Sequence, residues 1–180
     1  MHGSVQDWVR EAIMEADVKG LDVAEAGSRN WNGSWRNDVE YFQPASYAGI
    51  DLSPGPGVDV VMSAADLPLL GEFDLVFSTE MLEHAEDWRA AMAGMITAVK
   101  PGGILVITTR SKGFPYHDYE GDYWRYSVLN MRLIMERAGM EIVILISDPD
   151  CPGVFVKARK PMKWSFPDNP WEDIILDPPE

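Results

Sequence analysis

Two short apolar runs between Gly20 and Asp51 constrain the fold of this chain more than any other feature. Residues 21–25 (LDVAE) predict a buried strand that ends in Glu25, and residues 47–51 (YAGID) predict a second strand that ends in Asp51. A turn of small residues that contains Gly27 follows the first strand. Glycine lets a backbone approach a ligand closely, and a carboxylate accepts hydrogen bonds from two ribose hydroxyls. The stretch therefore predicts a nucleoside site at the ends of two strands.

The rest of the chain alternates between strand-like and helix-like segments. Apolar residues recur at three- and four-residue steps in the predicted helices, of which Ser4 and Ser127 are the predicted N-caps. We expect helices over residues 4–18, 85–99 and 127–138, with a short and weak one over 34–42. Further strands are expected over residues 58–62, 73–78 and 104–109, and a final pair over 141–146 and 154–158. The pattern predicts an α/β fold: a Rossmann-like, doubly wound, mostly parallel sheet that ends in an antiparallel hairpin.

Residues 161–180 differ from the rest in composition. They contain five prolines and few candidates for a core. We interpret them as a Pro-rich, acidic C-terminal tail that follows a domain of residues 1–160. Trp164, Phe166 and Trp171 are the residues expected to anchor this tail.

Composition and charge limit the classes of partner. The chain of 180 residues has 29 acids against 15 bases, a formal net charge of −14. This balance works against nucleic-acid binding, which depends on Lys and Arg contacts to phosphate, and against an anionic membrane surface. We see no apolar run of membrane-spanning length and no signal peptide, and the single cysteine, Cys151, fits a reducing compartment. A cytoplasmic location and no membrane partner are therefore expected.

Four segments in a consistent order resemble the class I S-adenosylmethionine-dependent methyltransferases. They are residues 21–27 (LDVAEAG), 49–52 (GIDL), 73–84 (FDLVFSTEMLEH) and 99–105 (VKPGGIL). The resemblance covers about residues 20–160, so the domain of residues 1–160 is expected to be methyltransferase-like. It implies S-adenosylmethionine as cofactor and methyl transfer to a small or polar acceptor, at an oxygen or a nitrogen.

The resemblance also implies roles for individual residues in cofactor binding. Glu25 would contact the methionine amino group, and Asp51 would accept both ribose hydroxyls. The turn of Gly27, Ser28 and Arg29 would pass close to the methionine part. The remaining cofactor-binding residues implied are Leu52 on the adenine, Ala65, Asp66 and Leu67 around its amino group, and Thr79, Glu80 and Met81 near the transferred methyl.

One departure from the family pattern leaves a second function open. Gly27 stands alone, with Arg29 and Trp31 where the family usually has further glycines. These bulky side chains would cover the methionine end or narrow the pocket. The alternative is a methyltransferase-like binding or scaffolding module with weak or absent catalysis. A nicotinamide dehydrogenase fits poorly, because the Gly-x-Gly-x-x-Gly turn that it needs is absent.

The acceptor side is less well defined by the sequence. His84 is the candidate general base, since its reference pKa lies near neutrality; the alternative is a residue that packs locally at a helix start. Tyr123, Trp124 and Arg125 are candidates for stacking on and hydrogen bonding a polar acceptor, or for a loop that packs on itself and closes the domain. His117, Asp118, Glu120 and Asp122 match no metal-ligand spacing, so no metal site is expected. The acceptor's identity and the oligomeric state do not follow from the sequence.

Overall fold

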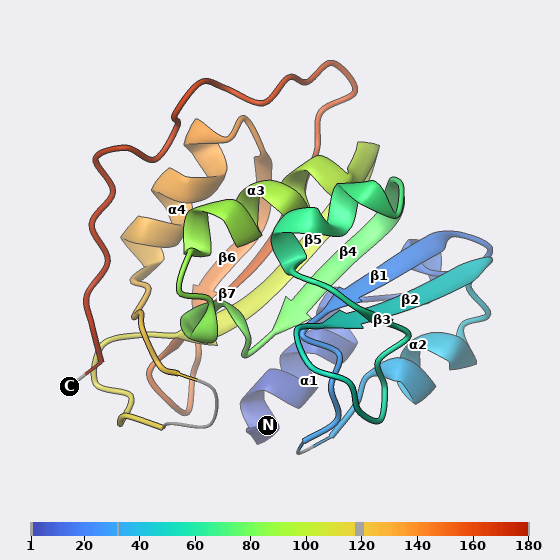
Figure 1. The fold of residues 1–180 in the computed structure, drawn as a ribbon, viewed down its shortest axis with the longest axis horizontal. Helices are drawn as coiled ribbons and strands as arrows, with labels where there is room; N and C mark the ends of the chain where they lie inside the picture. Colours follow the sequence, from blue (N-terminus) through green and yellow to red (C-terminus); the bar gives the residue numbers. More distant parts are fainter. Residues whose placement is uncertain (1, 32, 118–120, 180) are drawn as a thin grey trace.

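The computed structural model describes residues 2–31, 33–117 and 121–179, and within them one seven-stranded sheet forms the centre of the molecule (Figure 1). The strand order is β3-β2-β1-β4-β5-β7-β6. All neighbouring pairs are parallel except those made by β7, which runs antiparallel to β5 and to β6. The strands are β1 (Asp22–Ala26), β2 (Ser46–Asp51), β3 (Val60–Val61), β4 (Phe73–Thr79), β5 (Val99–Arg110), β6 (Glu141–Ser147) and β7 (Gly153–Arg159). The predicted sheet and its terminal antiparallel hairpin are confirmed.

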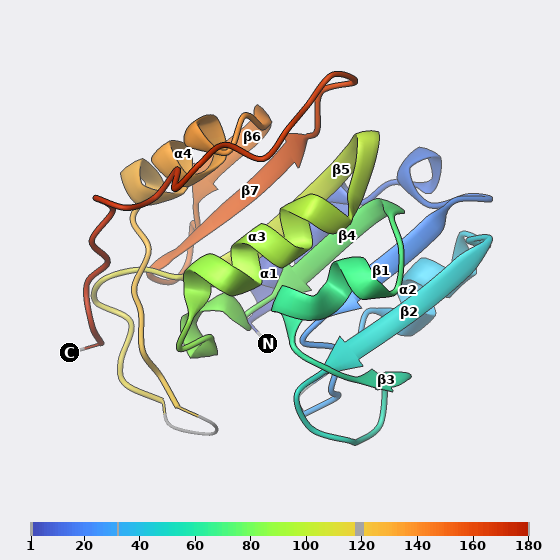
Figure 2. The ribbon, with the colours of Figure 1, turned by 45° about the horizontal axis from the view of Figure 1, so that its top comes forward.

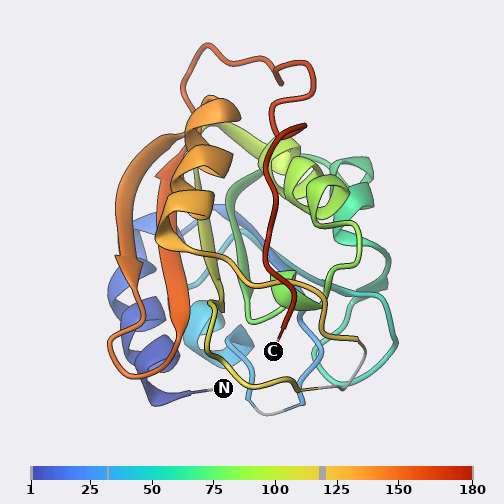
Figure 3. The same ribbon diagram turned by 90° about the vertical axis from the view of Figure 1, so that its left-hand side faces the viewer.

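Helices cover both faces of this sheet (Figures 2 and 3). The helices α3 (Trp88–Ala98) and α4 (Val128–Arg137) and the 3-10 helix η2 (Ala64–Leu69) pack on one face, over a core that includes Val76, Leu105 and Val156. The helices α1 (Gly3–Ala12) and α2 (Arg36–Tyr41) cover the other face, over a second core. Strands buried on both faces read as continuous apolar runs, as residues 104–107 do.

The structure corrects several predicted helix ends. α1 starts at Gly3, one residue before the predicted cap Ser4, which is buried and makes no cap. It stops at Ala12, and a separate 3-10 turn, η1 (Glu15–Asp17), replaces its expected last turns. α3 starts at Trp88, three residues after its predicted start and beyond a 3-10 turn, η3 (Leu82–His84). The Asp87 carboxylate caps it by accepting a hydrogen bond from the Ala90 backbone nitrogen at 3.0 Å. The predicted cap of α4 is confirmed, since the Ser127 hydroxyl accepts a hydrogen bond from the Asn130 backbone nitrogen at 3.0 Å.

The C-terminal segment packs against the sheet domain and contributes to its core. It passes along the α3–α4 side of the sheet (Figure 3), and Trp171, Ile174 and Leu176 are buried in the core there. The indole nitrogen of Trp171 donates to the Ile134 carbonyl at 2.9 Å. Of the three expected anchors, Trp171 is thus buried, and Trp164 packs against the core and donates to the Ala138 carbonyl at 2.8 Å. Phe166 is 36% exposed and packs edge-on against both of these rings. The division of the chain at residue 160 stays a prediction.

None of the helices in the described part of the chain is long and apolar enough to cross a bilayer. Two lysines near the end of the sheet domain are buried and hydrogen-bonded. The Lys157 ammonium is buried and donates to the Ala12 carbonyl and to Asp17, at 2.8 and 2.9 Å. The Lys160 ammonium is buried against backbone carbonyls that include that of Val99 at 2.6 Å. Both charges therefore hold elements of the fold together.

Candidate functional site

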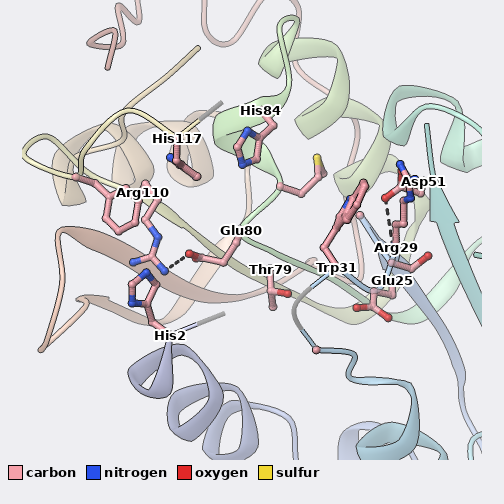
Figure 4. Close-up of a pocket in the computed structure, with 15 residues that line it drawn as sticks. His2, Glu25, Arg29, Trp31, Asp51, Thr79, Glu80, His84, Arg110 and His117 are labelled. Atoms are coloured by element: carbon pink, nitrogen blue, oxygen red, sulfur yellow. Dashed lines mark hydrogen bonds and ion pairs between the residues drawn. The ribbon is translucent and has the colours of Figure 1, made fainter. Parts of the chain in front are cut away.

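Two adjoining hollows open at the carboxyl ends of β1, β2 and β4, where ligands of parallel α/β sheets bind. The main cavity has a volume of about 340 Å³ and the second hollow about 300 Å³. They share a lining of Gly27, Asp51, Met81 and His84. Figure 4 shows two sides of the main cavity. We name the strand-end side for Glu25, Gly27 and Asp51, and the histidine side for Glu80, His84, Arg110 and His117.

Glu25 is a buried acid at the end of β1. Its side chain is only 3% exposed, and the Tyr47 hydroxyl donates to Oε2. Burial raises the pKa of Glu25 to about 7, even though the Tyr47 hydrogen bond acts in the opposite direction. A carboxylate that is buried this deeply is stable only beside compensating donors or a cation. Since Glu25 also lines the cavity, it is placed to receive a cationic group of a ligand.

The turn after β1 brings backbone directly against the cavity. Gly27 has φ +80°, and the backbone nitrogens of Gly27 and Ser28 both donate to the Ile50 carbonyl, at 2.9 and 3.0 Å. A Cβ at Gly27 would lie 2.7 Å from Cβ and Cγ of Met81. Ser28 is buried, and its hydroxyl has no hydrogen-bond partner among the described residues. The turn is therefore a close-fitting cradle in which the backbone itself lines the cavity.

Asp51 lies where the two hollows meet. Its Oδ2 accepts a hydrogen bond from the Arg29 backbone nitrogen at 3.2 Å, and Oδ1 accepts one from Ser53 at 3.0 Å. These bonds fix the carboxylate, and each oxygen keeps a further lone pair for a hydroxyl donor. Leu52, with 67% of its surface exposed, and Ala65 line the second hollow beside it. A ligand could therefore place a flat apolar group against Leu52 and Ala65 and a pair of hydroxyls on Asp51.

The segment after the turn forms a wall and leaves the cavity open. The Arg29 guanidinium lies 4.0 Å from the centroid of the Trp31 ring, and both residues line the cavity. Trp35 is buried beneath, where its indole nitrogen donates to the Thr79 hydroxyl at 3.2 Å. The bulky residues that replace the family's glycines therefore narrow one side without filling the space.

Glu80, on the histidine side, has a strained backbone conformation. It follows β4 with φ +55°, a left-handed conformation that costs a non-glycine residue about 1 kcal/mol. Thr108 donates to its Oε1 at 2.9 Å, and Arg110 forms an ion pair with it. Burial and the nearby Glu83 carboxylate raise the pKa of Glu80 to about 7. Such strain collects at functional sites, where the surrounding structure holds it in place.

His84 and His117 lie together above this ion pair (Figure 4). Their ring centroids are 4.8 Å apart. The Nδ1 atom of His84 lies 2.5 Å from the Gly121 carbonyl. Because a carbonyl only accepts hydrogen bonds, Nδ1 carries the proton and Nε2 is the atom of His84 that is able to act as a base. Burial lowers the pKa of His117 from its usual value.

Two residues predicted to bind the acceptor instead stabilise the loop between β5 and α4, in which they lie. Arg125 is fully buried and bonds both carboxylate oxygens of Asp122, at 2.5 and 2.7 Å. The indole nitrogen of Trp124 donates to the carbonyls of Ala85 and Glu86 at 3.0 and 3.1 Å. For these two residues the structure favours the alternative of a loop that closes the domain. Tyr123 does line the second hollow.

Two residues predicted at the adenine also lie away from the hollows. Leu67 is fully buried in the core, where it supports the loop from beneath. Asp66 is exposed and lines neither hollow. The acids Asp118 and Glu120 lie outside the described residues. Conversely, our sequence reasoning missed the cavity residues Arg110 and His2 and the buried Glu83. Of these three residues, only Glu83 could have been noticed in the sequence, because it lies between Glu80 and His84.

Comparisons with known proteins agree with this geometry. A family described as "Methyltransferase domain" matches residues 7–143. The ubiquinone biosynthesis O-methyltransferase of Dechloromonas aromatica is 29% identical over 124 residues, which are 59% of this chain and 50% of that protein. The chain thus spans about half the length of the curated relatives it matches.

Solved structures share the fold at low sequence identity. The 1,6-didemethyltoxoflavin-N1-methyltransferase of Burkholderia thailandensis, solved with S-adenosylhomocysteine, is 18% identical with a TM-score of 0.64, covering 89% of this chain and 83% of that one. The [4+2]-cyclase SpnF is 18% identical with a TM-score of 0.68, covering 88% and 80%. The cyclase shows that the same fold also serves a different reaction, so the function has to be argued from the site.

Proposed function

Because this chain belongs to the family of S-adenosylmethionine-dependent methyltransferase domains, we propose that it transfers a methyl group to an oxygen or nitrogen of a small polar acceptor. When bound, S-adenosylmethionine supplies the methyl group on a sulfonium that is already electrophilic. The protein's tasks are therefore to orient the reactants and to exclude water.

The observation that carries this proposal is the strand-end side, where two acids at the ends of adjacent strands flank the Gly27 cradle. We assign Asp51 to the ribose hydroxyls, because its carboxylate is fixed at the junction of the hollows. We assign Glu25 to the amino group of the methionine part, because this buried acid needs a cationic partner. The residues present thus fit the cofactor's charges and hydroxyls.

The remaining assignments follow from the linings of the two hollows. We place the adenine in the second hollow, against Leu52 and Ala65, with Tyr123 nearby. Thr79 and Met81 line the main cavity between the two sides, next to Glu80 of the histidine side, and we place the transferred methyl group there. The acceptor then occupies the histidine side, within reach of His84 Nε2 as general base.

The alternative of a binding module without catalysis rests on the single glycine of the turn. The open cavity beside Arg29 and Trp31 favours the enzyme, because these bulky side chains leave room for the cofactor. A small-molecule acceptor is supported by the curated relative's name and by the acidic balance of this chain. The cytoplasmic location stays a prediction.

Two measurements test the proposal together. Calorimetry with S-adenosylhomocysteine reports on the donor site, and transfer of labelled methyl groups into a fractionated metabolite extract reports on the acceptor. We expect saturable binding of one molecule per chain, with label in small-molecule fractions. Absence of binding at millimolar ligand would overturn the enzyme assignment, whereas binding without any transfer would favour the binding module.

A further inference from the structure

Glu83 is a buried acid for which the donor site provides no role. Its side chain is fully buried, and the Thr109 hydroxyl donates to Oε2 at 2.8 Å. The other oxygen, Oε1, has no hydrogen-bond partner among the described residues. An unpaired carboxylate oxygen in the interior costs several kcal/mol, by order of magnitude, unless a cation or a proton compensates it. Glu83 therefore needs a partner beyond those that its neighbours supply.

Two histidines stand beside this carboxylate. One ligand atom from each of Glu83, His84 and His117 lies within 4.8 Å of the others. The distance from His84 Nε2 to Glu83 Oε1 is 4.0 Å. An ion about 2 Å from each of three such atoms would hold them roughly 3.3 Å apart, so the three side chains would have to close in slightly around it. The sequence spacing hides this group, because His117 comes from a loop far from η3 in the chain.

Both histidines are oriented as metal ligands usually are. The Nδ1 of His84 faces the Gly121 carbonyl at 2.5 Å, and the Nδ1 of His117 lies 3.1 Å from Asp122 Oδ2. Histidine ligands commonly direct one ring nitrogen to a carbonyl or carboxylate, which leaves the other nitrogen for the metal. Asp122 is itself fixed by Arg125. The ion pair that holds the loop therefore also fixes the carboxylate that lies beside the ring of His117.

We propose that Glu83, His84 and His117 bind a divalent metal ion on the histidine side, and that this ion holds a hydroxyl oxygen of the acceptor. Two imidazoles and one carboxylate suit a first-row ion such as Mn²⁺, Co²⁺ or Zn²⁺, and they leave positions open for other ligands. His84 and His117 line the main cavity, so the open positions are accessible from it. This inference replaces the expectation of no metal site and rests on the proposed methyl transfer.

The charges around the group favour a bound cation. Arg110 is shared between Glu80 and Asp148, the latter at 3.2 Å, so its single charge faces several acids. Glu83 is fully buried, three residues after the largely buried Glu80. A divalent ion would relieve the repulsion between these two acids in a region of low dielectric.

The ion would give the acceptor the property that methyl transfer to oxygen requires. A hydroxyl bound to a divalent cation has a lowered pKa, as bound water does, and its proton passes to solvent water. The oxygen then bonds to the methyl carbon while the carbon–sulfur bond breaks and its electron pair stays on sulfur. The inferred acceptor class is therefore a hydroxyl compound, and His84 acts as a ligand in place of a base.

Manganese binding by the full chain tests this inference without relying on activity. The protein is stripped of metals with a chelator, and Mn²⁺ is titrated while the electron paramagnetic resonance signal of the free ion is recorded. Mn²⁺ is preferable to Zn²⁺, because Cys151 Sγ lies 3.6 Å from His2 Nδ1 and a thiol–imidazole pair attracts softer ions. The variants are Glu83→Gln and His117→Ala, with His2→Ala as a control in another part of the same cavity.

We expect one Mn²⁺ per chain in the wild type and in His2→Ala, and an affinity at least about 10-fold lower in Glu83→Gln and His117→Ala. Glu83→Gln keeps the side-chain shape, so its affinity for S-adenosylhomocysteine should match the wild type and confirm that it is folded. Absence of Mn²⁺ binding, or binding that neither substitution weakens, would overturn the metal site. Because S-adenosylhomocysteine binding is measured separately, that result would leave the proposed methyl transfer standing.

Discussion

The strand-end side of the cavity takes its acids from the ends of the neighbouring parallel strands β1 and β2, whereas the histidine side joins η3 to a loop that follows β5 (Figure 4). Backbone amides fix Asp51 on the first side. Buried ion pairs fix the second side, where Glu80 meets Arg110 and Asp122 meets Arg125. A backbone-built site tolerates side-chain changes nearby, but a site built on buried charges loses stability when one partner is removed.

The largest effect should come from removing the buried ion pair that holds the loop of the histidine side, and it should appear in the free energy of unfolding. Arg125→Met leaves Asp122 buried without its cation, so we expect the free energy of unfolding to fall by about 3–5 kcal/mol in urea titrations. Arg137→Met, which removes the exposed pair with Asp173, should leave the free energy of unfolding close to that of the wild type. If Arg125→Met instead kept its stability and raised only the KM for the acceptor, Arg125 would be a substrate ligand after all.

A smaller effect, on ligand affinity, is expected on the strand-end side. Asp51→Ala removes the carboxylate assigned to both ribose hydroxyls, and hydrogen bonds to a charged group contribute about 1.5–3 kcal/mol each. We expect roughly 100-fold weaker binding of S-adenosylhomocysteine in calorimetry. Asp38→Ala, which removes an exposed acid paired with Arg10, should keep the wild-type affinity. Equal affinities in the two variants would show that Asp51 lies outside the ligand contacts.

The Gly27 cradle should give an effect of about 10-fold on the same affinity. Gly27→Ala places a Cβ 2.7 Å from Met81 and must push that side chain into the ligand space. Gly20→Ala is the matched control, because its φ of +69° imposes a similar backbone cost while no atom lies within 4 Å of the added Cβ. Both variants should unfold more easily, but only Gly27→Ala should bind S-adenosylhomocysteine more weakly. A loss of affinity in both would mean that backbone strain, and not the cradle, is responsible.

The pH dependence of the strand-end side should be the mildest effect. With a pKa of about 7, Glu25 is mostly neutral at pH 6 and mostly ionised at pH 8. Affinity for the cationic amino group should therefore rise up to about 10-fold over this range and stay flat in Glu25→Gln. Stability changes in the opposite sense, because a raised acid pKa means that folding becomes less favourable as pH rises from about 4.5 to 7. A wild-type affinity that does not change with pH would separate Glu25 from the amino group.

The same contrast explains what the sequence could and could not predict. Glu25, Gly27 and Asp51 sit at strand ends, so the apolar runs before them determine where they lie in the fold. Thr79 at the end of β4 and Met81 just after it are placed in the same way. The side chain of Leu67 lies in the core because a short 3-10 helix turns it inward, and the periodicity of the sequence does not reveal this turn.

The histidine side depends on pairings between distant segments. Trp124 and Arg125 have the composition of a ligand-binding loop, but their donors are taken by carbonyls and by Asp122 in the folded chain. Glu83 and His117 become neighbours only when the loop after β5 folds back over η3. No spacing along the chain encodes that contact, so only the structure places them together.

A crystal structure of the protein with S-adenosylhomocysteine is the most direct test of the proposed cofactor site. We predict the ribose hydroxyls within hydrogen-bond distance of Asp51, the amino group beside Glu25 and the adenine in the hollow lined by Leu52 and Ala65. Ligand bound elsewhere on the molecule, or in this cavity with its ribose away from Asp51, would contradict it.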